Sequence, residues 1–328
     1  MSAVVLAKLL AIIVTVALGW LAGRLRWLGE AQADPARILS NAAFYIFVPA
    51  LLFRTTARVD LAQLPAGLLA AYFVPTLALL LAVYGTQHWL QRQQPQAEPA
   101  TPAVRAISVS YGNAVQMGIP MSAAMFGEAG LGLHLMLVSV HGLILLSLLT
   151  GLVEMDLARS KARQAQRSDL WQTLRSTLRN TVIHPVVLPV LVGLSWNLLG
   201  LGLPGLVDEV LQLLGSAVVP LCLVLIGLSL AYYGVQGHLR GAVGVTLLKL
   251  LLLPALVLVV ARWGFGLNGL ALSVLVMLAA LPVGSNALIF AQRYRTRQAE
   301  ATAAIVLSTL AFVLTAPMWL AVLSWLGR

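Results

Sequence analysis

Ten stretches of this sequence are long and apolar enough to cross a lipid bilayer, which takes about 20 mostly apolar residues per helix. Lipid offers no hydrogen-bond partners, so a spanning segment must satisfy its own backbone, as a helix does. Of the 328 residues, only 10% are charged, against about 25% in a soluble domain. The chain is therefore predicted to be an all-α integral membrane protein. The predicted spans are residues 3–23, 36–54, 63–90, 102–127, 129–152, 180–201, 208–233, 240–262, 268–292 and 299–326.

Lysine and arginine are unevenly distributed among the connections between these spans. Fifteen lie in the odd-numbered connections, whereas four lie in the even-numbered connections and at the C-terminus. Because basic residues concentrate on the cytoplasmic side of a membrane, the odd connections are predicted to be cytoplasmic and both termini periplasmic. The formal net charge of +10 then reflects topology, and no nucleic-acid partner is predicted.

The connection at residues 153–179 is long and charged, and it separates five spans from five. A unit with an odd number of spans enters the membrane with the opposite orientation when it is repeated. The sequence therefore predicts two inverted five-helix repeats, residues 1–152 and 180–328, joined by this cytoplasmic linker; inverted repeats are common in secondary transporters. The linker itself is either a short amphipathic helix on the membrane surface or a solvated segment.

The fourth and ninth predicted spans each contain helix-breaking residues. Pro120 and Pro282 lie within them, with Gly118 and Gly284 close by. Proline removes a backbone donor and disturbs the preceding turn, and glycine lets the chain leave helical dihedral angles. Unwound backbone at membrane depth persists only where protein or a water-filled cavity satisfies it. We therefore expect the two broken helices to cross near the bilayer centre; the alternative is that the prolines only kink packed helices.

Such a crossing predicts an anion-binding site. The amides that open each second half-helix carry partial positive charge and suit a carboxylate. Asn113 and Asn286 add side-chain donors beside the breaks. Three further polar residues, Tyr111, Gln116 and Ser285, are expected to line the same pocket.

Two ionisable residues inside the spans are candidates for charge compensation or coupling. Lys249 lies about 13 Å past Arg240 along a helix, and an ionisable group this deep is functional by default. It is expected to counter the charge of the anion or to occupy the place of a coupling cation; a structural hydrogen bond to a broken helix is the alternative. His141 suits a proton relay, although structural histidines are more frequent. The acidic residues lie in loops or at span ends, so no deep carboxylate is expected.

No set of residues typical of an enzyme is present. The sequence contains no nucleophile elbow, no metalloprotease motif and no phosphate-binding loop, which argues against those chemistries. Its single cysteine, Cys222, cannot form an intramolecular disulfide or a metal cluster. No enzyme activity, cofactor or metal is therefore predicted, and a carrier is favoured over an anion channel or a membrane-embedded sensor of carboxylates.

Four segments resemble the auxin efflux carrier family, which includes the plant PIN-type carriers and bacterial malonate permeases. The resemblance extends along nearly the whole chain, and the short central linker is similar to that of the bacterial members. The segments are NAAFYIFVPALLF (41–53), GNAVQMGIP (112–120), PLCLVLIGLSL (220–230) and LPVGSNALIFAQRY (281–294).

This resemblance implies a fold related to the bile-acid sodium symporters, with a scaffold of spans 1, 2, 6 and 7 and a moving transport domain of spans 3–5 and 8–10. It implies crossover prolines at Pro120 and Pro282, and asparagines beside them that bind an organic anion. It also implies a bacterial inner-membrane protein, often a homodimer through the scaffold. The predicted function is that of an elevator-type secondary transporter for a small organic anion, such as a mono- or dicarboxylate or an auxin-like acid, with membrane lipids as its other partners.

Overall fold

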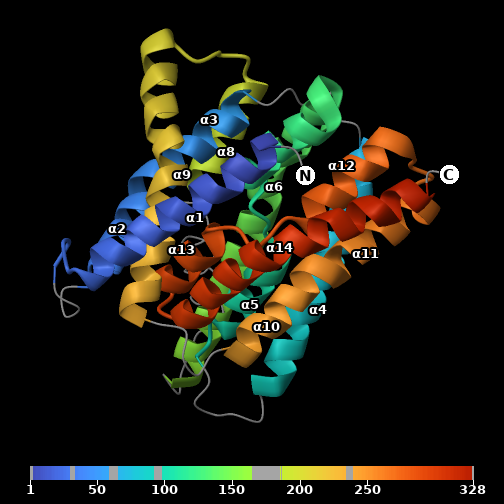
Figure 1. Cartoon of the computed structure of the whole chain (residues 1–328). Coiled ribbons are helices and arrows are strands. Elements are labelled where there is room, and N and C mark those ends of the chain that lie inside the picture. Colours follow the sequence, from blue (N-terminus) through green and yellow to red (C-terminus); the bar gives the residue numbers. More distant parts are fainter. Residues whose placement is uncertain are drawn as a thin grey trace.

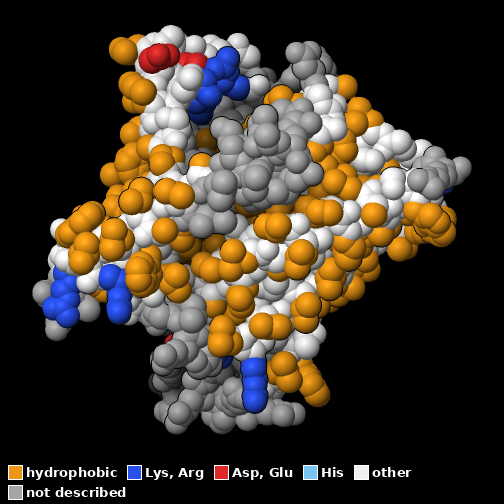
Figure 2. Space-filling model, viewed as in Figure 1, with side chains coloured by type: hydrophobic (Ala, Val, Ile, Leu, Met, Phe, Trp, Pro, Cys, Tyr) orange, Lys and Arg blue, Asp and Glu red, His pale blue; other side chains and the backbone are white. Residues whose placement is uncertain are grey.

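A computed structural model describes residues 3–29, 34–58, 66–91, 98–164, 185, 187–233 and 239–326, and these ranges are helical with no strand beyond one isolated bridge (Figure 1). Six helical segments among them are long and apolar enough to cross a membrane: Pro35–Arg58, Ala66–Gln91, Ala129–Ser160, Gly205–Tyr232, Leu239–Gly264 and Gln298–Leu326. On the face seen in Figure 2, hydrophobic side chains cover the middle of the molecule, and charged side chains appear toward its top and bottom. In the described part of the chain, the predicted all-α architecture with several membrane-capable helices is thus confirmed.

In the first half of the chain, one broken helix follows three longer helical segments. Short π-helical turns are labelled η: one, η2, lies within the second segment and another, η4, follows the break, and α6 changes direction at Gly127, whose φ is +65°. The elements are α1 (Ala3–Arg24), α2 (Pro35–Ala42), η2 (Ala43–Phe47), α3 (Val48–Arg58), α4 (Ala66–Gln91), α5 (Thr101–Ser110), η4 (Ala114–Gly118) and α6 (Ile119–Gln164).

The second half again contains a broken helix, here between α12 and α13. Every residue from Val274 to Gly284 is buried, so the core of the molecule surrounds this break. The elements are α8 (Val187–Leu198), α9 (Gly205–Tyr233), α10 (Leu239–Leu247), η5 (Leu248–Leu252), α11 (Leu253–Val259), η6 (Val260–Gly264), α12 (Gly269–Ala280), α13 (Asn286–Arg293) and α14 (Gln298–Leu326).

The first part of the predicted linker is helical and continues α6. The helix runs past residue 152 to Gln164, because this stretch is rich in good helix formers and free of glycine and proline. Asp156 is buried there, and its carboxylate accepts hydrogen bonds from Tyr84 (2.8 Å) and His88 (3.0 Å) of α4. The rest of the linker, 165–179, lies outside the described residues.

Helix α1 packs tightly against α9 through glycines. A Cβ at Gly227 would overlap the backbone of Val16, and one at Gly19 would overlap the backbone of Val224. Small residues allow this close backbone contact, which strengthens helix association inside a membrane. At one end of α3, the Arg54 guanidinium makes bonds of 2.8 and 3.1 Å to the Asp208 carboxylate of α9. Helices α1, α3, α8 and α9 therefore form one packed group.

A second group contains α4, α5 and α10–α14, which pack mainly against one another. A partly buried ion pair joins two of its helices: the Arg105 guanidinium of α5 makes bonds of 2.6 and 2.9 Å to the Glu300 carboxylate of α14. Glu300 is 3% exposed. Glu300 and Asp156 show that acidic residues near helix ends are buried in this fold, which the sequence did not reveal. Helix α6 contacts both groups.

The glycine contact between α1 and α9 gives a stability prediction. We expect Gly227→Ala to lower the free energy of unfolding by about 1–3 kcal/mol, because the added methyl overpacks the helix contact. The matched control is Gly244→Ala, at a helical glycine whose added Cβ meets nothing within 4 Å. There the higher helix propensity of alanine, about 1 kcal/mol, should leave stability equal or raised. Thermal unfolding in detergent measures both variants, and a Gly227→Ala protein as stable as the control would contradict the prediction.

Candidate functional site

The two breaks lie against each other at the centre of the molecule. The amide of Asn113 donates to the Pro282 carbonyl (2.8 Å), and the amide of Gly284 donates to the Tyr111 carbonyl (2.9 Å). Gly112 and Val283 form an antiparallel bridge between them. Each unwound segment thus satisfies part of the backbone of the other, as non-helical chain at membrane depth requires.

Glycine is needed where the segments touch. A Cβ on Gly284 would lie 2.9 Å from the Gly112 carbonyl oxygen and 3.0 Å from the Tyr111 ring. A Cβ on Gly112 would lie 3.3 Å from Nζ of Lys249. The crossing therefore leaves no room for even a methyl group at Gly284.

Of the two prolines that were expected to lie at the breaks, only one does. Pro282 is in the unwound segment between α12 and α13, whereas the first break is at residues 111–113 and Pro120 lies in the first turn of α6. Helical backbone already begins at η4 (Ala114–Gly118), and Pro120 follows this wider turn by two residues, which accommodates the amide that proline lacks. The expectation that Pro120 marks the first break is therefore corrected. The side chains of Pro120 and Gln116 lie outside the described residues.

Side chains from other helices satisfy the remaining polar backbone near the breaks. Ser308 of α14 accepts a bond from the Val283 amide (3.0 Å) and donates to the Ile305 carbonyl (3.1 Å). Nε2 of His134 lies 2.8 Å from the Ala114 carbonyl oxygen, and the imidazole fills the space that a Cβ on Gly118 would need. The sequence reasoning missed Ser308; its only signal was a hydroxyl inside a predicted span.

Lys249 is fully buried beside the crossing. It lies in the π-helical turn η5, and its amine donates a bond of 2.5 Å to the Ala279 carbonyl in the last turn of α12. The C-terminal end of a helix carries partial negative charge, which favours a cation there. On α14, the Trp319 indole donates to the Leu250 carbonyl of the same π-turn (2.8 Å). Lys249 therefore contacts the end of a broken helix, and it is not among the residues that line the adjacent cavity.

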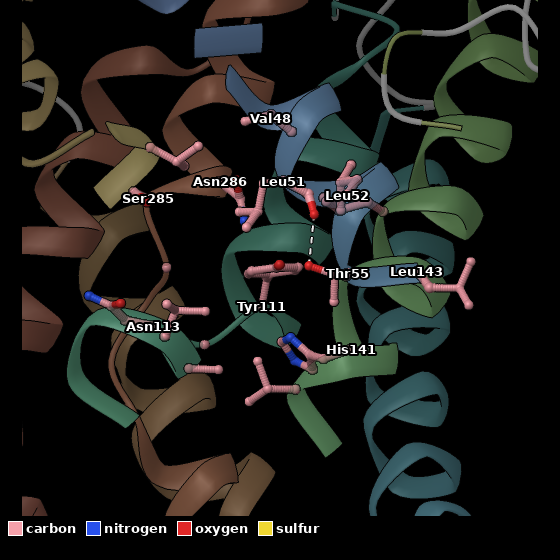
Figure 3. A pocket seen from close by; sticks show the side chains of 18 of the residues that line it. Val48, Leu51, Leu52, Thr55, Tyr111, Asn113, His141, Leu143, Ser285 and Asn286 are labelled. Atoms are coloured by element: carbon pink, nitrogen blue, oxygen red, sulfur yellow. Dashed lines mark hydrogen bonds between the residues drawn. The ribbon is translucent and has the colours of Figure 1, made fainter. Parts of the chain in front are cut away.

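A cavity of about 110 Å³ opens beside the crossing, between α3, α6, α9 and the two breaks (Figure 3). It brings together six of the residues singled out in the sequence: Tyr111, Asn113, His141, Gly284, Ser285 and Asn286. Most of the other lining side chains are aliphatic and come from α3 and α6, and none of the described lining residues is Lys, Arg, Asp or Glu. The cavity is thus apolar over most of its wall and polar at the breaks.

The polar end of the cavity is formed by the start of α13. Among the described residues, the backbone amides of Ser285 and Asn286 have no acceptor, as expected for the first amides of a helix. The side chain of Asn286 also interacts with the Tyr111 hydroxyl. These groups supply hydrogen-bond donors and a partial positive charge at one point of the cavity wall.

Other polar groups in the cavity already have partners. The hydroxyl of Thr55 donates to the Leu51 carbonyl (2.7 Å), as the dashed line in Figure 3 shows. His141 lies against the Tyr111 ring, with centroids 4.6 Å apart, and its Nε2 is 3.3 Å from the Tyr72 hydroxyl. His141 therefore joins α4 to the wall of the cavity.

Comparison with known proteins points to transport. A family model described as membrane transport protein matches residues 4–320. An uncharacterized transporter from Methanothermobacter thermautotrophicus is 25% identical, over 96% of this chain and 97% of the relative. The uncharacterized transporter YfdV from Escherichia coli K12 is 27% identical, over 96% of each chain. Neither of these names states a substrate.

Proposed function

Since this chain belongs to the auxin efflux carrier family of membrane transport proteins, we propose that it is a secondary carrier that moves a small organic anion by elevator-type alternating access. The observation that carries this proposal is the cavity at the crossing, where the free amides at the start of α13 face a space between two packed groups of helices. Crossed broken helices at a midplane site are a known plan for such carriers.

The carboxylate of the anion binds at the start of α13. It accepts hydrogen bonds from the amides of Ser285 and Asn286 and from the Asn286 side chain, and the dipole of α13 favours its charge. Tyr111 and Asn113 border the same position. Because no cationic side chain lines the described cavity, main-chain donors provide most of the recognition of the charge.

The rest of the cavity favours a monocarboxylate with an apolar body. Its wall also contains aliphatic side chains such as Leu51, Leu143 and Leu146, and the Thr55 hydroxyl among them is already hydrogen-bonded. A second carboxylate in that region would lose its hydration without gaining a partner, which is costly. An aromatic or branched-chain acid therefore fits the wall better than a dicarboxylate does.

The two packed groups of helices supply the moving parts. Helices α1–α3, α8 and α9 act as the scaffold, and α4–α6 and α10–α14 act as the transport domain, which corresponds to ten spans in two inverted repeats. Sliding of the transport domain exposes the cavity to each side in turn.

Lys249 keeps the C-terminal end of α12 at the crossing and offsets the negative charge of the anion. The carrier functions in a bacterial inner membrane with both termini periplasmic, as a homodimer through the scaffold.

Uptake into proteoliposomes tests this function. A panel of carboxylic acids is offered while sodium and pH gradients are varied independently. We expect saturable uptake and counterflow, with benzoate and branched-chain acids transported better than malonate. Unitary currents without counterflow would indicate a channel instead, and binding without any flux would indicate a sensor.

Asn286→Ala tests the anion site directly. Loss of a hydrogen bond to a charged group costs about 1.5–3 kcal/mol, so the substrate Kd should rise at least about tenfold. Asn268→Ala, at an exposed asparagine whose side chain donates to the nearby Gly266 carbonyl, is the control and should bind as the wild type does. Equal affinity and uptake rate in the two variants would exclude Asn286 from the site.

A further inference from the structure

A second and larger cavity lies across the first break from the anion site. Its volume is about 390 Å³, and α1, α9 and residues 305–310 of α14 form its walls. Asn113 is the one residue that lines both cavities among the described part of the chain. The side chains from α1 and α9 are Val16, Ala17, Trp20, Leu223, Ile226 and Leu230. This groove is therefore an apolar slot with one amide at its inner end.

The groove follows one face of α1 toward the end of that helix. Val16 and Trp20 are one turn apart on this face, and Arg24 follows one turn later. From Val16 to Arg24 the helix rises about 12 Å, close to the roughly 15 Å of hydrocarbon in one leaflet of a bilayer. The lining on α1 ends at Trp20, so the groove and the further turn to Arg24 together have the length that one leaflet of lipid would fill.

A cationic side chain, that of Arg24, lies one helical turn beyond Trp20, the last lining residue of α1. The Arg24 guanidinium is 5.7 Å from the centre of the Trp20 ring, and both residues are exposed. Trp20 itself lines the groove. Tryptophan and arginine at a helix end are typical of the level of the lipid headgroups, where basic residues attract anionic lipids. The Thr309 hydroxyl in the wall donates to the Ile305 carbonyl and so offers no donor to a polar ligand.

We propose that this groove binds one anionic phospholipid, whose acyl chain lies between α1, α9 and α14 and whose phosphate pairs with Arg24. The apolar walls suit the chain, and the guanidinium suits the phosphate. A carboxylate substrate fits less well, because the only side-chain donors among the described lining residues, besides the Thr309 hydroxyl, are the Asn113 amide and the Trp20 indole, and neither carries a charge. The site requires only that the chain is embedded in a membrane, so it stands independently of the carrier mechanism.

The position of this lipid links it to movement. Under the proposed function, α1 and α9 belong to the scaffold and α14 belongs to the transport domain. A chain held between them fills space that changes when one group slides past the other. Occupancy of the groove should therefore change the rate of transport without changing which anion is bound.

Native mass spectrometry of the purified full-length protein, exchanged into equal amounts of phosphatidylglycerol and phosphatidylcholine, tests the proposal. We expect the wild type to retain one phosphatidylglycerol. Ala17→Trp, which fills the groove, and Arg24→Gln, which removes the charge, should each lower this retention at least fivefold. The matched controls are Leu18→Trp, on the exposed face of the same helix, and Arg262→Gln, an arginine near the end of another helical segment; both should retain the lipid.

Quenching of tryptophan fluorescence locates the bound chain. Phosphatidylglycerol with brominated acyl chains should quench the wild type more than Trp20→Phe, because Trp20 contacts the chain. If Ala17→Trp does not fold, Val306→Trp fills the groove from α14 instead. Equal retention by the filled variants and their controls, equal retention of the two lipids, or displacement of the lipid by octanoate would each overturn the proposal.

Discussion

Lys249→Met should abolish most transport while leaving the fold nearly as stable as that of the wild type. The Lys249 amine is buried and bonds to the Ala279 carbonyl at the end of α12. Its loss leaves that carbonyl unsatisfied, at a cost of about 1–3 kcal/mol, but it also removes an amine whose burial is itself unfavourable. We therefore expect a melting temperature close to that of the wild type. The transport rate should fall at least about tenfold, because the cationic group nearest the crossing is lost.

Two further variants separate the charge of Lys249 from its hydrogen bond. Lys249→Gln keeps a donor for Ala279 without an amine, so it should be as stable as the wild type but transport as poorly as Lys249→Met. Trp319→Phe removes the bond to the Leu250 carbonyl but leaves the Lys249 amine in place. This variant should therefore transport better than Lys249→Met and Lys249→Gln. The initial rate of anion uptake from pH 5 to 8 is the measurement. Wild-type rates for Lys249→Met at every pH would show that the lysine is structural.

The positions of the long helices follow from hydrophobic length alone. The predicted spans at 36–54 and 240–262 correspond to the helical segments Pro35–Arg58 and Leu239–Gly264. The length of an apolar stretch reveals where such a helix lies, because side chains that face lipid must be apolar along the whole span. The π-helical turns within these segments were not predicted, although η2 and η5 each end two residues before a proline, Pro49 and Pro254, which lacks the amide that α-helical bonding needs. In η5 the Leu250 carbonyl also accepts a bond from Trp319 of α14.

The sequence predicted that two broken helices cross, but it did not predict the residues at which the first one breaks. Paired proline and glycine in two spans indicated two breaks, and the backbone bonds between Asn113 and Pro282 and between Gly284 and Tyr111 confirm that they meet. The first break lies at residues 111–113 because it pairs there with the second break, a tertiary contact that one segment alone cannot specify. Pro120, the stronger local signal, lies within helical backbone instead, just after the π-helical turn η4.

Burial of the charged groups could not be inferred from position in a span. Glu300 is near the start of a helix, as its place at a span end predicted, but it is buried, and Arg105, 195 residues away in the sequence, pairs with it. Burial of such a pair depends on which helices pack together, and that is set by the whole fold. Ser308 is a similar case, because its role depends on the Val283 amide reaching it.

Gly284→Ala is expected to disrupt the crossing and remove transport. The added Cβ would lie 2.9 Å from the Gly112 carbonyl oxygen and 3.0 Å from the Tyr111 ring, so the two unwound segments must separate. Overpacking of this kind costs about 1–3 kcal/mol. Separation also lengthens the bond from the Gly284 amide to the Tyr111 carbonyl and shifts the start of α13, whose amides form the polar end of the cavity. A shift of about 1 Å at a binding site lowers rates by about a hundredfold.

Gly132→Ala is the matched control for this change. Gly132 lies in α6, and a Cβ there meets nothing within 4 Å, so the same substitution adds helix propensity without a clash. Anion binding, uptake rate and melting temperature are measured for both variants. We expect Gly132→Ala to match the wild type and Gly284→Ala to lose binding and uptake together, because the anion and the crossing depend on the same backbone. Normal binding by Gly284→Ala would mean that the anion is held away from the crossing, since the start of α13 cannot keep its position once the segments separate.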